Sequence, residues 1–337
     1  MINLYVIGNE KIYSNKKNFY CPNIDFKTIV EGLNKYFKVI LIARFCSQKQ
    51  IFKINHNKIF VSPNIISYIR CVVLSFKNLK SNKYLIISIT PYTFCAFLIL
   101  QFFSNKIYLY LRSDGHKEYE RILGKQWAFL YSFMYFFFLK RAKIISCGKE
   151  LVQNKKFFLV NPSELDEYWF KNQKNIFYEK KIKLLYVGRI RIEKGIFNFL
   201  NLFKKLDDRF QLTIIGDRYH GHFNIKNILF KNFFSNVKHL IKQYDKHHIL
   251  ILPSYTESHP KVVYEALSRL RPVLIFDDIK HIIRDMNGIF VSKRNLKDFL
   301  KTIDQIFKKY KFIKKEILKN NFPKKNTFIL QLYKILR

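Results

Sequence analysis

The sequence predicts an α/β protein of two domains, and three observations support that prediction. The chain has 337 residues, and domains commonly hold about 100–200 residues each. Short β-branched and aromatic runs alternate with longer segments of helical period, which indicates parallel sheets covered by helices. A polar segment without period, residues 161–181, falls near the middle of the chain and is the predicted connection between the domains.

Each predicted strand is a run of β-branched, Leu or aromatic residues bounded by polar ones. In the first half these runs are Ile2–Ile7, Val39–Ala43, Tyr84–Ile89, Ile107–Leu111 and Lys143–Ser146. In the second half they are Lys183–Val187, Leu212–Ile215, Asn227–Phe230, His248–Leu252 and Val273–Phe276. Helical spacing gives one apolar face to Ile196, Phe199, Leu200, Phe203 and Leu206. The tail after Pro323 predicts a closing helix.

The composition is that of a folded chain with a large positive charge. Hydrophobic residues make up 49% and charged residues 25%, which excludes extended disorder. Lys and Arg total 61 against 24 Asp and Glu, a formal net charge of +37. This charge predicts an anionic partner: nucleic acid, a phosphorylated small molecule or the acidic face of a membrane. An AT-biased coding sequence would also raise the Lys content, without any functional reason.

The cysteines and the apolar runs predict a protein of the cytoplasm. The five cysteines lie in the first half of the chain and form no CxxC pair, which favours a reducing compartment over disulfides or structural zinc. The first residues lack the features of a secretory signal. The longest apolar runs, Phe94–Phe103 and Trp127–Leu139, fall short of the ~18 residues of a spanning helix. We therefore expect a soluble or peripheral protein.

The first motif, YVGRIRIEKG from Tyr186 to Gly195, joins a predicted strand to a predicted helix. Gly188 permits a sharp turn, and Arg189 and Lys194 project from the loop beyond the strand's carboxyl end, where ligands bind in parallel sheets. Two fixed cations there suit a diphosphate, because Arg donates forked hydrogen bonds and Lys supplies a point charge. The alternative is an ordinary turn with solvated charges.

The second motif, PSYTESHPKVVYEA from Pro253 to Ala266, follows another predicted strand. Glu257 lies in its loop, and Pro260 occupies the expected first position of a helix. The free N–H groups of that helix start form an anion site that needs no metal. Glu265, more than one turn into the helix, can reach the same pocket. Alternatively, Glu265 caps the helix or pairs with a neighbouring Lys.

Together the two motifs resemble the retaining GT-B glycosyltransferases of family 4. The similarity also covers LTIIGD at residues 212–217, RPVLI at 271–275 and NGIFV at 287–291, and a weaker match is IISCGKEL at 144–151. It implies two Rossmann-like domains facing each other across a cleft. We set these domains at residues 1–165, for the acceptor, and 166–320, for the nucleotide sugar. Residues 321–337 would form a C-terminal helix that returns to the first domain.

The resemblance also implies site residues. Arg189, Lys194 and Glu257 would be catalytic: the two cations hold the donor diphosphate, and Glu257 contacts the transferred sugar. Glu265 would hold the ribose hydroxyls. The other donor-binding candidates are Gly188, Gly216, Lys231, Ser258, His259 and Pro260. No Asp-x-Asp motif occurs, which agrees with a metal-free reaction without a cofactor. Retention would require the leaving diphosphate to help deprotonate the acceptor.

Several departures from the family pattern leave the donor open. The first loop, Gly8-Asn9-Glu10, has one Gly where the family often has two, and Ser258 and His259 stand where Gly and Phe are common. The acceptor-binding candidates are Gly8 in that loop and Arg112, Asp114 and His116 after the strand that ends at Leu111. A simple Ser-Asp-Gly turn is the alternative interpretation of this last segment.

The aromatic segment Trp127–Leu139 has two interpretations. It is either a core helix that covers the sheet, or an interfacial helix that exposes one side to anionic lipid, because Lys and Arg residues flank it. A lipid-linked acceptor would give the second interpretation a purpose.

The resulting hypothesis is a bacterial enzyme that moves a hexose-type sugar from a UDP- or GDP-sugar to a lipid-linked or surface-polysaccharide acceptor. The reaction would belong to lipopolysaccharide, O-antigen or capsule biosynthesis, at the inner face of the cytoplasmic membrane. One alternative is a basic nucleic-acid-binding protein, but the sequence lacks a nucleic-acid-binding signature and its Lys residues are dispersed. The other is an inactive GT-B protein that binds glycans or nucleotides, which the intact set of Arg189, Lys194, Glu257 and Glu265 disfavours.

Overall fold

The structure, a computed structural model, describes residues 2–15, 18–56, 58–77, 81–152, 155–174, 181–217, 225–234 and 236–337. It divides into two compact units. The first comprises Met1–Glu164 and Lys324–Arg337, and the second comprises Leu165–Pro323. The sequence had placed these divisions after residues 165 and 320.

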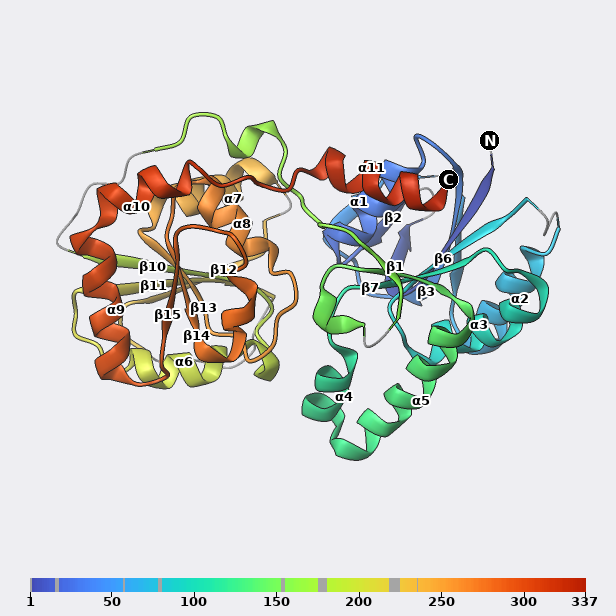
Figure 1. Cartoon of the computed structure of the whole chain (residues 1–337), viewed down its shortest axis with the longest axis horizontal. Helices are drawn as coiled ribbons and strands as arrows, with labels where there is room; N and C mark the ends of the chain where they lie inside the picture. Colours follow the sequence, from blue (N-terminus) through green and yellow to red (C-terminus); the bar gives the residue numbers. More distant parts are fainter. Residues whose placement is uncertain are drawn as a thin grey trace. The chain divides into compact units, whose positions relative to one another are not determined.

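The first unit is built on a nine-stranded sheet whose parallel part has the order β5-β3-β1-β6-β7-β8-β9. Figure 1 labels its strands β1, β3, β6 and β7. These strands are β1 (Asn3–Asn15), β3 (Lys38–Cys46), β5 (Ile59–Ser62), β6 (Lys83–Ile87), β7 (Ile107–Leu111), β8 (Lys143–Ser146) and β9 (Phe157–Leu159). The predicted bounds of β7 and β8 are confirmed. β5 and β9 were not predicted.

β1 runs much further than its predicted end at Ile7. Its pairing with β3 shifts register between Ile7 and Lys11 and then continues. The second half of β1 also pairs antiparallel with β2 (Asn18–Cys21), which in turn pairs with β4 (Phe52–Ile54). The predicted loop at Gly8 is therefore wrong, because Gly8 lies within a strand. Beyond it, the fully buried Ile12 anchors the continued strand in the core.

Helices cover both faces of this sheet. One core packs α1 (Ile24–Leu33) and α11 (Lys325–Leu336) against the sheet, so the closing helix belongs to the first unit, as predicted. The other core contains α2 (Ile65–Leu74), α3 (Pro91–Phe103) and α5 (Lys125–Arg141). Short 3-10 turns lie at Lys149–Leu151 and, in the second unit, at Glu167–Trp169, Ile192–Lys194 and Asp277–Ile282.

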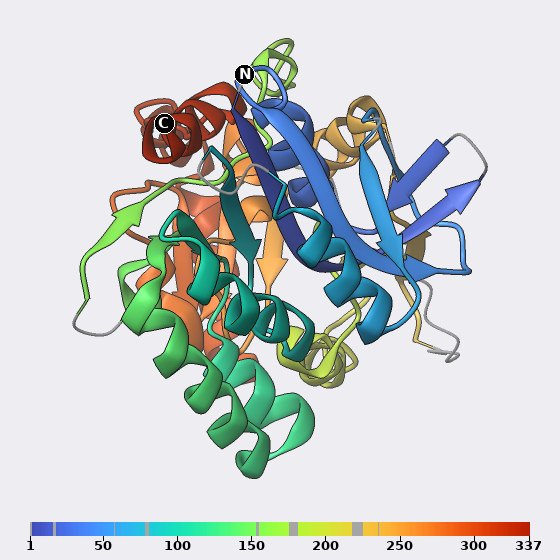
Figure 2. The same cartoon turned by 90° about the vertical axis from the view of Figure 1, so that its right-hand side faces the viewer.

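The hairpin of α4 (Gly115–Leu123) and α5 extends beyond the sheet of the first unit (Figures 1 and 2). One side of α5 is buried and includes Tyr131, Met134 and Phe138. The other side is exposed, and Phe129 has 76% of its surface accessible to solvent. The core interpretation is therefore confirmed for the buried side of the helix, and the interfacial interpretation of the exposed side stays a prediction.

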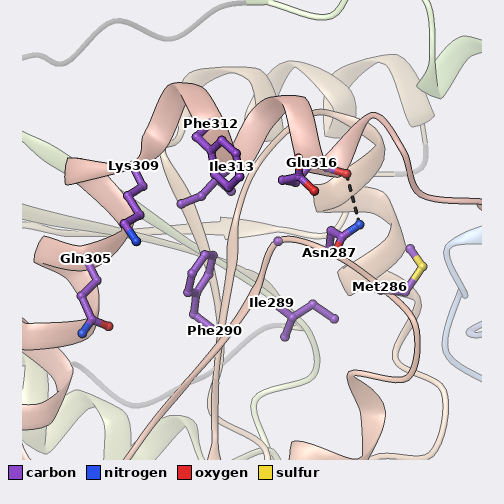
Figure 3. Close-up of a pocket in the computed structure, with 10 residues that line it drawn as sticks. Met286, Asn287, Ile289, Phe290, Gln305, Lys309, Phe312, Ile313 and Glu316 are labelled. Carbon is purple, nitrogen blue, oxygen red and sulfur yellow. Dashed lines mark hydrogen bonds between the residues drawn. The ribbon is translucent and has the colours of Figure 1, made fainter.

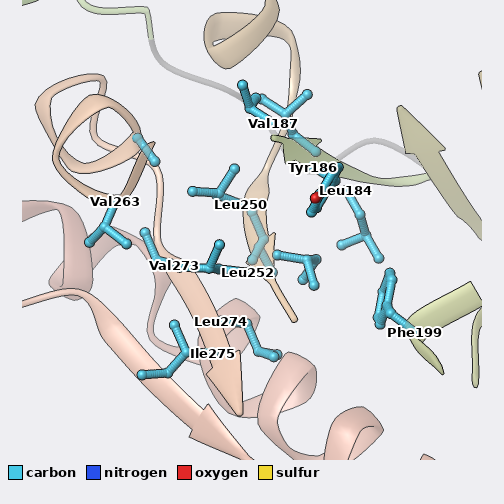
Figure 4. Packing of buried hydrophobic residues seen from close by; sticks show 14 of the residues in the cluster. Leu184, Tyr186, Val187, Phe199, Leu250, Leu252, Val263, Val273, Leu274 and Ile275 are labelled. Carbon is cyan, nitrogen blue, oxygen red and sulfur yellow. The ribbon is translucent and has the colours of Figure 1, made fainter. Parts of the chain in front are cut away.

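The second unit has a six-stranded, fully parallel sheet of order β12-β11-β10-β13-β14-β15. Its strands are β10 (Ile182–Val187), β11 (Phe210–Gly216), β12 (Ile228–Asn232), β13 (Ile249–Leu252), β14 (Val273–Phe276) and β15 (Ile289–Ser292). Its helices are α6 (Ile196–Phe203), α7 (Val237–Lys246), α8 (Lys261–Ser268), α9 (Leu296–Lys308) and α10 (Tyr310–Ile317). The strands read as nearly continuous apolar runs because both faces are covered, and Figure 4 shows their side chains in the core.

The start of the predicted connection, from Leu165 onward, packs onto the second unit. Arg269, itself 1% exposed, donates hydrogen bonds to the carbonyl oxygens of Trp169, Lys171 and Asn172. Its charge is matched by Asp245, whose two carboxylate oxygens accept at 2.8 and 2.9 Å. A buried guanidinium with an acid and carbonyl partners is fully paired, so this segment is fixed to the unit. Residues 175–180 of the predicted connection lie outside the described residues.

Candidate active site

The two sequence motifs meet where the strand order of the second sheet reverses. β10 and β13 are adjacent in the sheet although the chain passes through β11 and β12 between them. In open α/β sheets, ligands bind at such a point, beyond the carboxyl ends of the strands. The loop at residues 188–195 follows β10, and the loop at residues 253–260 follows β13.

The first loop is held by the side chains of Tyr186 and Asp217. The hydroxyl of Tyr186 donates to the carbonyl of Arg189 at 2.7 Å, and Asp217 Oδ1 accepts from the amide of Ile190 at 2.7 Å. A Cβ on Gly216 would lie 2.7 Å from the carbonyl oxygen of Gly188. Gly216 therefore acts by letting the two strand ends approach closely, and Asp217 fixes the loop.

Gly195 lies where the two loops pack closely against each other. Its φ of +62° is left-handed, and a Cβ there would lie only 1.9 Å from the carbonyl oxygen of Pro253. The amide of Tyr255 also donates to the carbonyl of Glu193 at 3.0 Å. Only glycine tolerates both the conformation and the contact, so this residue sets the distance between the loops.

Lys194 and Glu257 form an ion pair across the two loops. Lys194 Nζ lies 2.7 Å from Glu257 Oε1, and the hydroxyl of Ser254 donates to the same oxygen at 2.7 Å. The two charged side chains are 20% and 12% exposed, so both are held near the surface and can be reached from solvent. The structure thus brings together one predicted phosphate-binding cation and the predicted sugar-binding acid.

The other two members of the predicted set lie apart from this pair. Arg189 is exposed, and its side chain makes no hydrogen bond or ion pair with any other described residue. Glu265 is buried in α8, where Tyr244 donates to its Oε2 at 2.7 Å. Burial raises the pKa of Glu265, although the bond from Tyr244 and the charge of Lys261 oppose the shift. Among the described residues, Glu265 and Glu257 share no hydrogen-bond partner.

The start of α8 differs by one residue from the prediction. The helix begins at Lys261, so Pro260 is the residue before it and not its first helical position. Ser258 is buried, and the ring of His259 stacks on Tyr264 with centroids 4.7 Å apart. Lys231, in β12, donates to Gln243 Oε1 at 2.9 Å.

Three basic residues that sequence reasoning missed brace the second loop. Arg294 donates to the carbonyls of Pro253 and Ser254 at 2.8 and 3.1 Å. Arg284 donates to the carbonyl of Ser258 at 3.1 Å, and His281 Nε2 lies 2.7 Å from the carbonyl of Glu257. These residues lie beyond β14 and β15, at the same edge of the sheet. Their position after these two strands was the only feature of the sequence from which they could have been predicted.

In the first unit, Arg112 lies beyond β7 in a polar cluster. It donates to Glu10 at 3.1 Å and to the hydroxyl of Ser88 at 3.3 Å. Ser88 follows β6 with a left-handed φ of +64°, an uncommon conformation for a residue other than glycine. The cluster therefore gathers at the carboxyl ends of β6 and β7, beside Glu10 in the extended part of β1. Gly8 lies close by, where its carbonyl accepts from Tyr68 at 3.0 Å.

The other two acceptor-binding candidates have local structural partners. Asp114 caps α4 and accepts from the amide of Lys117 at 3.2 Å, so this segment begins a helix. His116 Nδ1 lies 3.0 Å from the hydroxyl of Ser132, and the rings of Tyr131 and Tyr135 pack against the imidazole. Burial lowers the pKa of His116, although nearby Asp114 opposes the shift.

A separate hollow of about 510 Å³ lies at the amino end of β15, away from these loops (Figure 3). Phe290, Phe312 and Lys309 contribute to its lining, and it contains none of the predicted site residues. Among the described residues, no group of three or more His, Cys, Asp or Glu side chains could hold a metal ion. No helix within the described residues combines the length and the apolar character that crossing a bilayer requires.

Residues 167–325 match the family model described as glycosyl transferases group 1. In sequence, the chain is 25% identical over 350 residues to an uncharacterized 41.2 kDa protein in the cps region of Klebsiella pneumoniae. This similarity covers 95% of the chain and 90% of that protein.

Solved glycosyltransferase structures share the fold of the chain over nearly its whole length. A sucrose-phosphate synthase from Thermosynechococcus elongatus matches with a TM-score of 0.71 and 13% identity, covering 99% of this chain and 98% of the other. WaaG, a glycosyltransferase involved in lipopolysaccharide biosynthesis, has a TM-score of 0.69 and 14% identity, with 98% and 99% covered. HepE from Anabaena, solved with UDP and glucose, has a TM-score of 0.68 and 11% identity, with 100% and 99% covered. The chain therefore has the GT-B fold.

Proposed function

We propose that this chain, a glycosyltransferase whose residues 167–325 match the glycosyl transferases group 1 model, moves a hexose-type sugar from a UDP- or GDP-sugar with retention. The observation that carries the proposal is the pair of Lys194 and Glu257 at the reversal point of the sheet, 2.7 Å apart. The bond that breaks joins the diphosphate of the donor to its sugar. The cation on one loop suits the diphosphate, and the acid on the adjacent loop suits the sugar hydroxyls. HepE was solved with UDP-glucose, which supports a nucleotide sugar as the donor class.

The charges of the site suit this reaction. As the anomeric bond breaks, negative charge develops on the leaving diphosphate and positive charge on the sugar. Lys194 and the exposed Arg189 stabilise the first, together with the free amides that begin α8. Glu257 lies beside Lys194 and holds the sugar. Retention follows from the family resemblance, with the leaving diphosphate helping to deprotonate the acceptor.

The same reasoning supports a reaction without metal. In glycosyltransferases that use a divalent ion, the ion neutralises the diphosphate of the donor. Here Lys194, Arg189 and the start of α8 supply that positive charge. The braced loop at residues 253–260 fixes the start of α8 before the donor arrives. Asp217 fixes the loop that carries Arg189 and Lys194. We expect EDTA to leave turnover unchanged. A loss of turnover that Mg²⁺ or Mn²⁺ restores would contradict this part of the proposal.

We propose that the acceptor is a lipid-linked or surface polysaccharide. The relative in a cps region and the fold neighbour in lipopolysaccharide biosynthesis support this class. The α4–α5 hairpin supports a place at an anionic membrane surface. Its exposed aromatic residues include Phe129 and Phe136, and Lys140 Nζ lies 4.2 Å from the ring centroid of Phe136. Exposed rings beside cations are the pattern of helices that lie in a membrane interface.

A screen of UDP- and GDP-sugars for slow donor hydrolysis tests the proposed function. We expect one sugar to be hydrolysed, and its nucleotide diphosphate to raise the melting temperature of the protein. Glu257→Gln should abolish turnover while it retains most of the nucleotide-induced shift, because Lys194 and Arg189 remain. Nucleotide binding without any turnover would instead favour an inactive GT-B protein. Salt-sensitive DNA binding without a nucleotide effect would favour the nucleic-acid alternative.

A further inference from the structure

The extension of β1 builds a second surface at the carboxyl edge of the first sheet. Residues that pair directly across strands share one face of a sheet. Tyr13 pairs with Tyr20, Tyr20 with Lys53, and Lys11 with Arg44. Lys11 and Tyr13 are two residues apart on one strand and therefore share that face. We call this set, Lys11, Tyr13, Tyr20, Arg44 and Lys53, the ribbon face; β1 and β2 are blue in Figure 2.

The ribbon face carries positive charges, and its own strand segments contain no acidic residue to neutralise them. Neither residues 11–21 nor residues 38–54 contain an Asp or Glu. Glu10, the nearest acid in sequence, is held by Arg112 and Asn23. Lys49 adds a further cation, with its Nζ 5.8 Å from the centroid of the Tyr20 ring. The local charge thus favours an anionic ligand.

Arg44 is fixed by neutral partners. Its guanidinium carbon lies 4.3 Å from the ring centroid of Tyr92, in the first turn of α3, and its Nη1 donates to Asn9 Oδ1 at 3.3 Å. Among the described residues it forms no ion pair. A guanidinium that is stacked and half-buried, but keeps its charge and donors, is pre-organised for a planar or phosphate anion.

Two tyrosines complete the ribbon face. The rings of Tyr13 and Tyr20 lie 6.1 Å apart at 48°, and both are half-buried. A tyrosine ring presents an apolar face about the size of a hexose ring, with a hydroxyl at its edge. Anchored rings beside cations therefore fit a sugar that carries a negative group better than either a free anion or a neutral sugar.

From this arrangement, and resting on the proposed function, we infer that the ribbon face binds the acceptor through an anionic group on one of its sugars. Arg44 holds the anion, Lys11 and Lys53 add charge, and Tyr13 and Tyr20 pack against the sugar rings. The chemistry required is a phosphate or a uronate carboxylate on a glycan. Lys11 and Tyr13 lie past Gly8, the last residue of β1 that pairs with β6. The ribbon face therefore extends past the carboxyl end of β6, the side of a parallel sheet on which ligands bind.

The test measures binding of three sugars of one ring type to the full chain: glucose, glucuronate and glucose 6-phosphate. Saturation-transfer NMR titrations are run with saturating UDP, so that the donor site does not capture the phosphate. We expect at least one charged sugar to bind about tenfold more tightly than glucose, and added salt to weaken that advantage. Arg44→Met should remove the preference, and Arg44→Lys should restore it only in part. Arg70→Met, on the exposed side of α2, is the matched control and should change nothing.

The variants separate the outcomes. If Arg44→Met weakens only the carboxylate sugar, or only the phosphate sugar, that group is the one recognised. Equal binding of all three sugars, or equal effects of Arg44→Met and Arg70→Met, overturns the inference. The UDP-induced rise in melting temperature is measured on every variant. An Arg44→Met protein that keeps this rise is folded with its donor site intact, whereas a wild-type chain without any rise contradicts the proposed function itself.

Discussion

In the proposed function, Lys194 is the residue on which donor binding depends most directly. Its ammonium lies on a loop beside Gly195 and pairs with Glu257, whose side chain is only 12% exposed. In Lys194→Met, the diphosphate loses a fixed charge and Glu257 loses its cation. We expect kcat/KM for donor hydrolysis to fall by about 10²-fold, the usual cost of one pre-organised donor, and the UDP-induced thermal shift to disappear. Lys301→Met, on the exposed side of α9, is the control and should keep both the activity and the thermal shift.

Glu265 gives a prediction about pH. Its pKa is raised by burial, so the folded state favours the protonated acid. The stability that this group contributes is therefore present below its unfolded pKa and is lost as the pH rises through the raised value. Glu265→Gln resembles the protonated acid and can still accept from Tyr244. We expect the variant to gain in melting temperature relative to the wild type from pH 4 to pH 8. A difference that is constant with pH would contradict this account.

Among individual residues, the sequence predicted those that belong to the two motifs and missed those that hold the motif loops in place. Lys194 and Glu257 were found because their spacing follows the order of strand, loop and helix. Arg284 and Arg294 were not, because their partners are backbone carbonyls of the loop at residues 253–260. A bond to a carbonyl leaves no pattern in residue types, and only the folded chain brings these partners together.

At the scale of elements, the turn into α6 should be the least tolerant of change. Gly195→Ala forces a left-handed residue, at a cost of about 1–2 kcal/mol, and adds a Cβ 1.9 Å from the Pro253 carbonyl. We expect a fall in the free energy of unfolding of more than about 2 kcal/mol and loss of the UDP-induced shift. Gly124→Ala also has a positive φ but meets nothing within 4 Å. This control separates strain from collision, and it should keep UDP binding.

The aromatic side of α5 should bind membranes without supporting the fold. Phe129 and Phe136 are 76% and 53% exposed, so replacing both with Ser removes little buried surface. Each ring contributes roughly 1.5–3 kcal/mol when fully buried, and the double variant should therefore bind anionic vesicles at least about tenfold more weakly. Cosedimentation with phosphatidylglycerol vesicles measures this, and the melting temperature checks the fold. Equal binding of the two proteins would exclude this surface.

Strands were predicted well where burial alone defines them. β7, β8 and β14 have the predicted bounds because each is an apolar run that is buried or nearly so. The second half of β1 and the short strands β2 and β4 were missed. Polar or lysine residues interrupt β1 and β4, and the apolar stretch of β2 is only Phe-Tyr-Cys. Their strand form comes from pairing partners that lie far apart in the sequence. Gly8 was taken for a loop residue because the family pattern has a glycine-containing loop after the first strand.

The whole molecule consists of two units with separate cores, and the chain visits the first unit twice. Its last helix, α11, buries Phe328, Ile329, Leu332 and Leu336 against the first unit. The carbonyls of Leu336 and Arg337 also accept hydrogen bonds from Lys83. The sequence predicted this return only through the family resemblance, because an amphipathic tail does not specify which core it joins.

This arrangement predicts which part of the molecule each perturbation affects. Leu332→Ala removes a fully buried side chain from the first unit and should cost about 3 kcal/mol of its stability. In the proposed function UDP binds the second unit, and it should then stabilise only that one. In calorimetry we expect two transitions, of which Leu332→Ala lowers one and UDP raises the other. Ile303→Ala, in the core of the second unit, is the reciprocal control and should lower the UDP-sensitive transition. One transition that responds to all three changes would mean that the two units unfold together.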